Sequence, residues 1–151
     1  MADKLPFNGP VEFNGAITAN TRIRGNAGFV FPQGAPADGG DNGDPVTAAM
    51  ILSQIVTVDA GADRSKATDT AANLISGLSL TVDNDAFDFS LINLATDGTS
   101  AVTLTGGSGV TLVGGMQIQA IDTDEAQYSG GVARFRVRRT SSTAVTIYRI
   151  G

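Results

Sequence analysis

The sequence predicts an all-β protein, a β-sandwich or jelly-roll-like domain with one short helix and an extended N-terminal β arm. Three observations predict this class. Gly is abundant, at 19 of 151 residues, and Val, Thr and Ile are frequent, which favours strands and turns over helices. Short alternating segments separated by turn residues fill the second half of the chain. A six-residue repeat with strand periodicity runs through the first thirty residues.

The arm, residues 1–31, is defined by this repeat, which reads FNGPVE-FNGAIT-ANTRIR-GNAGFV from position 7. Six is a multiple of two, so in an extended chain each repeated position returns to the same face, whereas an α-helix would rotate it away. A single extended segment cannot bury its apolar face against itself, so we expect identical copies, as a homotrimer, to cover it. The residues of that face are Val11, Phe13, Ile17, Ala19, Ile23, Ala27 and Phe29.

A segment rich in Gly, Pro and Asp, residues 32–47, is predicted to be a hinge between the arm and a β-sandwich domain at 48–151. The sandwich is predicted to open with a buried strand at 48–58. The only helix signal lies in RSKATDTAANLISGL (64–78), where Thr68 or Asp69 can cap the helix and apolar residues follow at helical spacing.

The remaining segments are predicted to be strands, because apolar and polar residues alternate between turn residues. The glycine-rich string TGGSGVTLVGG (105–115) is interpreted as containing the turn of a β-hairpin. It lacks the Lys and Ser/Thr of a phosphate-binding loop. The predicted strands are 78–82, 86–95, 100–107, 109–115, 116–121, 130–139 and 144–150.

Two acidic segments could carry chemistry. DGGDNGD (38–44) offers four side chains with oxygen atoms to a cation such as calcium, but it matches no EF-hand, and a solvated acidic hinge is preferred. Asp122, Asp124 and Glu125 cluster on a predicted turn, where they are solvated or meet nearby arginines. No metal or other cofactor is predicted.

Catalysis is not expected. The chain contains no His and no Cys, which excludes imidazole acid–base chemistry and thiol nucleophiles. Lys4 and Lys66 are the only lysines, and both are expected to be exposed. A hydrolase or lectin that uses the acidic loops with calcium remains an alternative. No apolar run approaches the length that spans a bilayer, so no membrane association is expected.

Charge is divided unevenly along the chain. All 15 acidic residues lie at or before Glu125 with five basic ones, giving −10, and the last 26 residues carry five arginines and no acid, giving +5. Three of these, Arg134, Arg136 and Arg138, alternate with apolar residues and are predicted to line one face of a strand. That face is either solvated or paired within the chain, or it grips acidic groups on an adjacent subunit or another protein. Binding to nucleic acid is not expected, since that needs a broad basic surface.

A resemblance to a known group rests on AFDFSLINLATDGTSAVTLTGGSGVTLVG (86–114) and SGGVARFRVRRTSSTAVTIYRIG (129–151). These segments resemble the C-terminal part of the head decoration, or cement, proteins of tailed bacteriophages. The resemblance implies a compact β domain, a homotrimer, and a virion location on the capsid exterior, where major capsid protein subunits meet. The hexads resemble the stems of trimeric phage fibres, so a fibre or knob protein for host attachment is the alternative. The predicted capsid or subunit interface comprises Val11, Phe13, Ile17, Ile23, Phe29, Arg134, Arg136 and Arg138.

Overall fold

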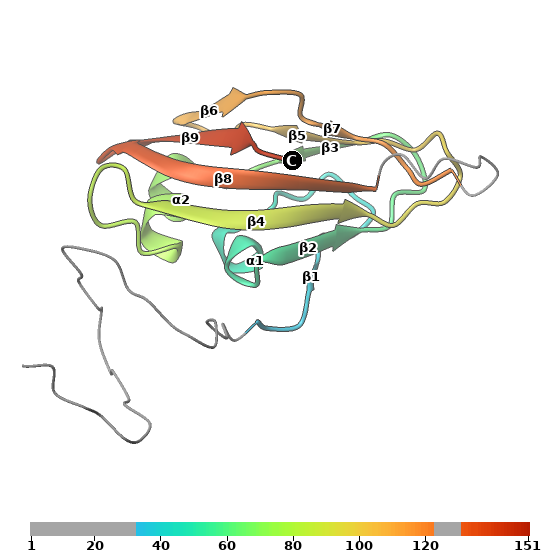
Figure 1. Ribbon diagram of the computed structural model, residues 1–151, viewed down its shortest axis with the longest axis horizontal. Coiled ribbons are helices and arrows are strands. Elements are labelled where there is room, and N and C mark those ends of the chain that lie inside the picture. The colour runs from blue at the N-terminus through green and yellow to red at the C-terminus, as the bar shows by residue number, and fades with distance from the viewer. Residues whose placement is uncertain (1–32, 123–130) are drawn as a thin grey trace, which may run out of the picture. The chain divides into compact units, whose positions relative to one another are not determined.

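A computed structural model describes residues 33–122 and 131–151 of the chain (Figure 1). This part is mostly β-strand, as predicted, but it contains two short helices, not one. No helix in these two ranges is both long enough and apolar enough to cross a membrane. In chain order the elements are β1 (Ala37–Asp38), α1 (Ala48–Leu52), β2 (Ile55–Val58), β3 (Arg64–Ala67), α2 (Ala71–Gly77), β4 (Ala86–Asn93), β5 (Val102–Thr105), β6 (Val110–Val113), β7 (Gln117–Ile118), β8 (Val132–Ser141) and β9 (Ala144–Arg149).

The strands form two mixed sheets. Six strands lie in the order β1-β2-β4-β8-β9-β6, and three lie in the order β3-β5-β7. Figure 1 shows the long strands β4 and β8 side by side in the larger sheet. Antiparallel pairing joins β4 to β8, β8 to β9 and β5 to β7, whereas the other four pairs are parallel.

The predicted hairpin of 100–107 and 109–115 is wrong. Its two strands, β5 and β6, belong to different sheets. The glycine-rich segment between them carries the chain from one sheet to the other, and β6 pairs in parallel with the distant β9. Turn residues show where a chain changes direction, but not which strand it pairs with afterwards.

Both sheets and both helices contribute to one apolar core. The alternation predicted for 86–95 and 130–139 is confirmed over most of their length, because every second residue from Phe87 to Asn93 and from Ala133 to Val137 points into this core. Phe89 and Phe135 face each other in register, with their ring centroids 5.4 Å apart. The polar residues that alternate with the buried ones along β4 and β8 therefore lie on the opposite face of the sheet. The largest buried apolar residues are Val46, Ile51, Val56, Val58, Leu74, Phe89, Leu91, Leu104, Ile118, Phe135 and Ile147.

The strand predicted at 48–58 is wrong in its first half, which forms α1. The Thr47 hydroxyl caps this helix by accepting a hydrogen bond from the Met50 backbone N–H at 3.2 Å. Five apolar residues are too few to separate a helical period from a buried strand, and Ala, Met and Leu favour the helix. Gln54, with a left-handed φ of 69°, then turns the chain into β2.

The helix predicted within 64–78, with Thr68 or Asp69 as its cap, begins one or two residues later than expected. Residues 64–67 form β3, and α2 starts at Ala71, where the Thr70 hydroxyl accepts a hydrogen bond from the Asn73 backbone N–H at 3.3 Å. The expected caps Thr68 and Asp69 therefore precede the helix. The strand predicted at 78–82 is absent from the described structure, and that segment forms turns.

Part of the segment predicted as a hinge, 32–47, belongs to the β domain. It supplies β1, which pairs with β2, and Val46, which is fully buried and whose backbone N–H donates to the Ala67 carbonyl at 2.8 Å. The β domain therefore includes residues before position 48. The interface residues predicted in the arm, Val11, Phe13, Ile17, Ile23 and Phe29, lie outside the described residues.

Candidate interaction surface

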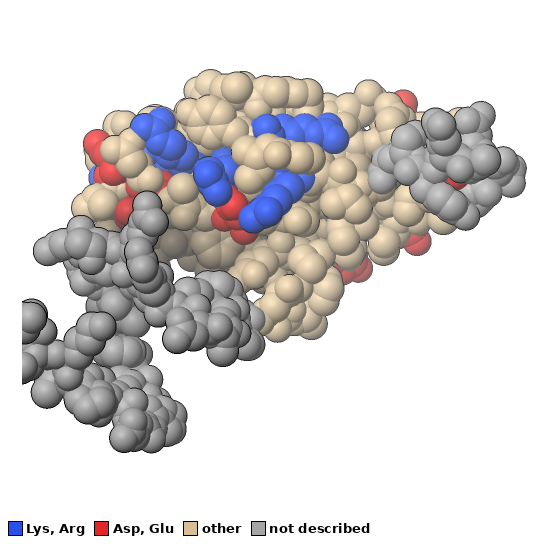
Figure 2. Space-filling view, in the orientation of Figure 1, with Lys and Arg blue, Asp and Glu red and all other residues tan. Residues whose placement is uncertain are grey.

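The outward face of the six-stranded sheet carries the predicted arginine stripe. Arg134, Arg136 and Arg138 project from β8 on the side opposite the core, since the residues between them are buried. Figure 2 shows basic side chains gathered over this side of the molecule, with acidic atoms among them. We call this surface the arginine face. The register of β4 and β9 with β8 places further residues on it, namely Asp88, Ser90, Thr146 and Tyr148.

One carboxylate organises the arginine face. Asp88 lies opposite Arg136 in register, and the Arg136 guanidinium donates two hydrogen bonds to it, from Nε to Oδ1 at 2.6 Å and from Nη2 to Oδ2 at 2.8 Å. Arg134 Nη2 adds a third, at 3.1 Å from Oδ2. The hydrogen bond from Arg136 is the main reason that the pKa of Asp88 is lowered, and the same contact raises the pKa of Arg136.

The charges on this face do not cancel. Asp88 offsets one of three positive charges, and Arg138 is hydrogen-bonded to the neutral Asn84 side chain. The side chains of Arg134 and Arg136 remain 61% and 49% exposed. The arginine face therefore presents a net charge of about +2 on a chain whose overall charge is −5.

The structure thus brings the three predicted arginines together. Two of them, Arg134 and Arg136, form ion pairs with Asp88 of the same chain. Asp88 had no role in the sequence-based prediction. The signal was present, because Asp88 lies between Phe87 and Phe89 and so faces away from the core. Asp122 lies at a bridge to Asp97, and the acidic residues at 124 and 125 fall outside the described residues.

Apolar side chains border the arginine face. Val132 precedes the arginines on the same side of β8, and Val113 of β6 lies beside Tyr148 of β9. Val132, Val113 and Ile150 are each roughly half exposed. Arginine and tyrosine among exposed apolar side chains is a composition typical of the centre of a protein–protein interface.

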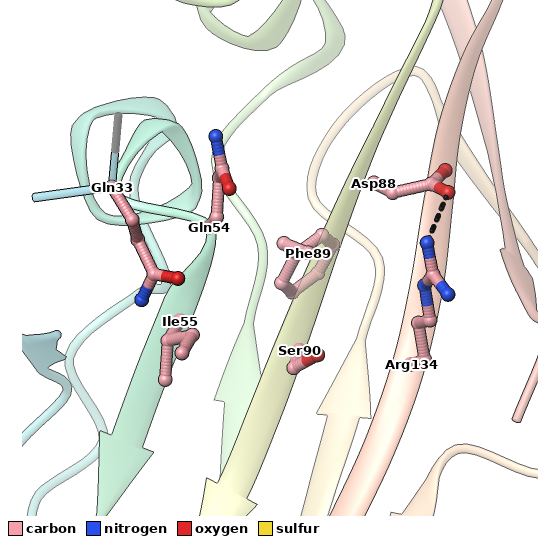
Figure 3. Close-up of a pocket in the computed structure, with 7 residues that line it drawn as sticks. All are labelled: Gln33, Gln54, Ile55, Asp88, Phe89, Ser90 and Arg134. Carbon is pink, nitrogen blue, oxygen red and sulfur yellow. Dashed lines mark hydrogen bonds and ion pairs between the residues drawn. The ribbon is translucent and has the colours of Figure 1, made fainter. Parts of the chain in front are cut away.

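A shallow polar cavity of about 290 Å³ opens beside Asp88 (Figure 3). Gln33 and Gln54 lie on one side of it, and the ion pair of Asp88 and Arg134 lies on the other. Ile55, Phe89 and Ser90 complete the lining. These groups can hydrogen-bond to a polar side chain or a main chain, but the seven lining residues offer no pairing of a nucleophile with a base.

The acidic loop at 38–44 is built around a buried cation of the chain itself. Lys66 was predicted to be exposed, and this is wrong, because the residue is 0% exposed. Its ammonium donates to the Gly39 carbonyl at 2.6 Å and to Asn42 Oδ1 at 3.2 Å. Burial lowers the pKa of Lys66, against the opposing effect of the neighbouring aspartates. Alternation places residue 66 on the inner side of β3, a position that sequence patterns assign to apolar residues.

The oxygens that could hold calcium are engaged by other groups. Asp41 Oδ1 accepts from Arg64 Nε at 2.7 Å and from the Gly61 backbone N–H at 3.1 Å, and the Arg64 hydrogen bond lowers the pKa of Asp41. Asp38 and Asp44 accept hydrogen bonds from within the loop. Across residues 33–122 and 131–151 there is no cluster of three acidic residues that could hold a metal ion. The acidic loop is therefore held by contacts with Lys66 and Arg64 of β3.

No family model, curated protein sequence or solved structure matches the chain. Its function is therefore inferred from its surface and from the sequence resemblance.

Proposed function

We propose that this chain is a structural virion protein of a tailed bacteriophage, a head decoration or cement protein that binds the outer capsid surface as a homotrimer. The observation that carries the proposal is the arginine face, an exposed basic surface with an apolar border on an otherwise acidic chain. The resemblance of residues 86–114 and 129–151 to decoration proteins supports the same assignment. The protein acts by binding, not by catalysis.

In this proposal the arginine face docks on acidic groups of the major capsid protein. Arg138 keeps most of its donors for a partner, because its one hydrogen bond within the described structure goes to Asn84. Docking would also remove Tyr148 and the bordering valines from water. Interfaces of standard size bury roughly 1,600 Å² in total, and three per trimer would add avidity. Each interface must be broken before neighbouring capsid subunits separate, so the shell resists internal pressure.

The trimer and a jelly-roll-like topology belong to the proposal as predictions. Within the six-stranded sheet, the antiparallel pairs are β4 with β8 and β8 with β9. A trimeric fibre or knob protein is the second candidate, and the hexad repeat of residues 7–30 favours it. The two candidates differ in attachment, to the capsid in one and to the tail or host in the other.

The test is to add purified protein to capsids of the encoding phage that were assembled without it, and to image them by electron microscopy. We expect density on the capsid exterior for the wild type and reduced occupancy for Arg138→Gln. Arg138 is chosen over Arg136, because changing Arg136 would also leave Asp88 without its main partner. Ser65→Glu, an exposed site on the other sheet, is the matched control, since it changes the net charge by the same amount.

Two results would reject the proposal. Density confined to tails would favour the fibre assignment. Equal occupancy for Arg138→Gln and the wild type would show that the arginine face takes no part in binding.

A further inference from the structure

Within the part of the chain that the structure describes, β6 is the last strand of the six-stranded sheet, and no strand pairs with its outer edge. Proteins commonly guard sheet edges with charge, proline, bulges or very short strands. The opposite edge has such guards, because β1 is two residues long, follows Pro36 and contains Asp38. β6 contains no charge and no proline, and its register with β9 runs unbroken from Val110 to Val113.

Across residues 33–122 and 131–151, the core is also incompletely covered along β6. Six half-buried apolar residues border the core, and three of them, Val110, Leu112 and Met116, lie on β6 or just after it. On the other side of the strand, Val113 is 46% exposed. Both the backbone edge and the apolar layer beneath it are therefore open to an added strand.

We infer that β6 pairs with the hexad segment, residues 7–31, of a second copy of this chain. This inference rests on the homotrimer of the proposed function and names the contact that joins its neighbouring chains. The segment suits the edge because it alternates at strand period and carries three charged residues, Glu12, Arg22 and Arg24, in 25. Its apolar side would continue the layer of Val110 and Leu112, and its asparagines would lie beside Thr111 and Val113.

The sheet order favours donation between chains. The described structure begins at Gln33, just before β1, and β1 lies five strand spacings from β6, about 24 Å at 4.8 Å per spacing. The described part of each chain therefore begins at one edge of the sheet and, among the described residues, has an unpaired strand edge at the other. A contact of this head-to-tail kind closes into a ring when the rotation between copies permits.

Cysteine cross-linking tests the inference directly, because the chain has no cysteine of its own. Thr18→Cys marks the polar side of the hexads, and Val113→Cys marks the edge of β6. Two differently tagged full-length chains, each with one of these changes, are co-expressed and treated with a short bismaleimide. We expect a cross-linked heterodimer, and none when Ser65→Cys on the other sheet replaces Val113→Cys.

A charge at the edge gives a second measurement. Val113→Lys should abolish the trimer measured by light scattering while far-UV circular dichroism stays unchanged. The matched control is Val82→Lys, at an exposed valine in the turn before β4, which should remain trimeric. Absence of the Thr18→Cys with Val113→Cys heterodimer would overturn the inference, as would a Val113→Lys protein that assembles like the control.

The two proposals can fail separately. If wild-type protein decorates capsids while the Val113→Lys protein remains trimeric, the function stands and the edge pairing falls. If the chains cross-link as expected but do not bind capsids, the edge pairing stands and the capsid assignment falls.

Discussion

At the scale of single residues, Lys66 connects β3 to the acidic loop at 38–44. A buried ammonium costs free energy unless hydrogen bonds and negative charges compensate it. Here the Gly39 carbonyl and the Asn42 side chain accept from it, and aspartates of the acidic loop lie near. These two hydrogen bonds join the loop to β3.

We expect Lys66→Met to lower the free energy of unfolding by about 1–3 kcal/mol, because the Gly39 carbonyl loses its donor and the aspartates lose a counter-charge. The measurement is urea denaturation followed by circular dichroism. Lys4→Met, at the chain's only other lysine, is the control for loss of the charge. Equal midpoints for Lys66→Met and wild type would show that the ammonium contributes nothing.

A second residue, Asp97, should make the free energy of unfolding depend on pH in the acidic range. Its carboxylate accepts from the Ser100 hydroxyl and from the backbone N–H groups of Ser100 and Thr99, and the Ser100 hydrogen bonds are the main reason that its pKa falls to about 2. In the unfolded chain an aspartate titrates near about 3.9. The folded state therefore gains stability from Asp97 above that pH and loses it as pH falls toward about 2.

We expect the difference in unfolding free energy between wild type and Asp97→Asn to shrink steadily as the pH is lowered from about 4 to about 2. Parallel denaturation series at each pH measure it. A difference that stays constant over this range would mean that the carboxylate titrates alike in the folded and unfolded chain.

At the scale of elements, the entry into β6 depends on a glycine. Gly109 has a φ of 76°, and an added Cβ would lie 2.9 Å from both the Ala71 side chain and the Thr143 carbonyl. We expect Gly109→Ala to destabilise the fold by more than about 1 kcal/mol in urea denaturation. Gly115→Ala is the control, since an added Cβ there meets nothing within 4 Å. Equal losses for the two variants would contradict the assigned geometry.

Sequence reasoning located the elements whose patterns are long. The strands predicted at 86–95, 130–139 and 144–150 alternate over enough residues to identify them, and that alternation also predicted the arginine stripe. It missed α1, which is too short to show a period, and β3, whose inward residue is the charged Lys66. Pairings such as β6 with β9, and Asp88 with Arg136, join residues more than thirty positions apart, and no local pattern encodes them.

At the scale of the whole molecule, the separation of charge along the chain should govern association. The proposed contact sets a basic face against acidic groups of a capsid, and salt screens such pairs at the exposed rim of an interface. We expect capsid occupancy to fall as NaCl rises from about 50 to about 500 mM, because the screening length shortens severalfold over this range. Sedimentation of capsids with bound protein measures it.

Arg138→Gln should show a weaker dependence on salt than wild type, since it brings one charge fewer to the contact. Ser65→Glu again serves as the control. Capsid occupancy that does not change with salt for any of the three proteins would indicate an apolar contact to which the arginines do not contribute.

The pairing of β4 with β8 links the inside of the domain to its outside. Phe89 stacks on Phe135 in the position next to the one where Asp88 meets Arg136, so a slip of register would separate the rings and the ions together. Successive arginines on the outer face of β8 are therefore about 6.8 Å apart along the strand, and the packing of the two rings keeps this strand in register. Substitutions can change the outward side chains of β8 one by one. Their spacing cannot change unless the core residues that alternate with them are repacked.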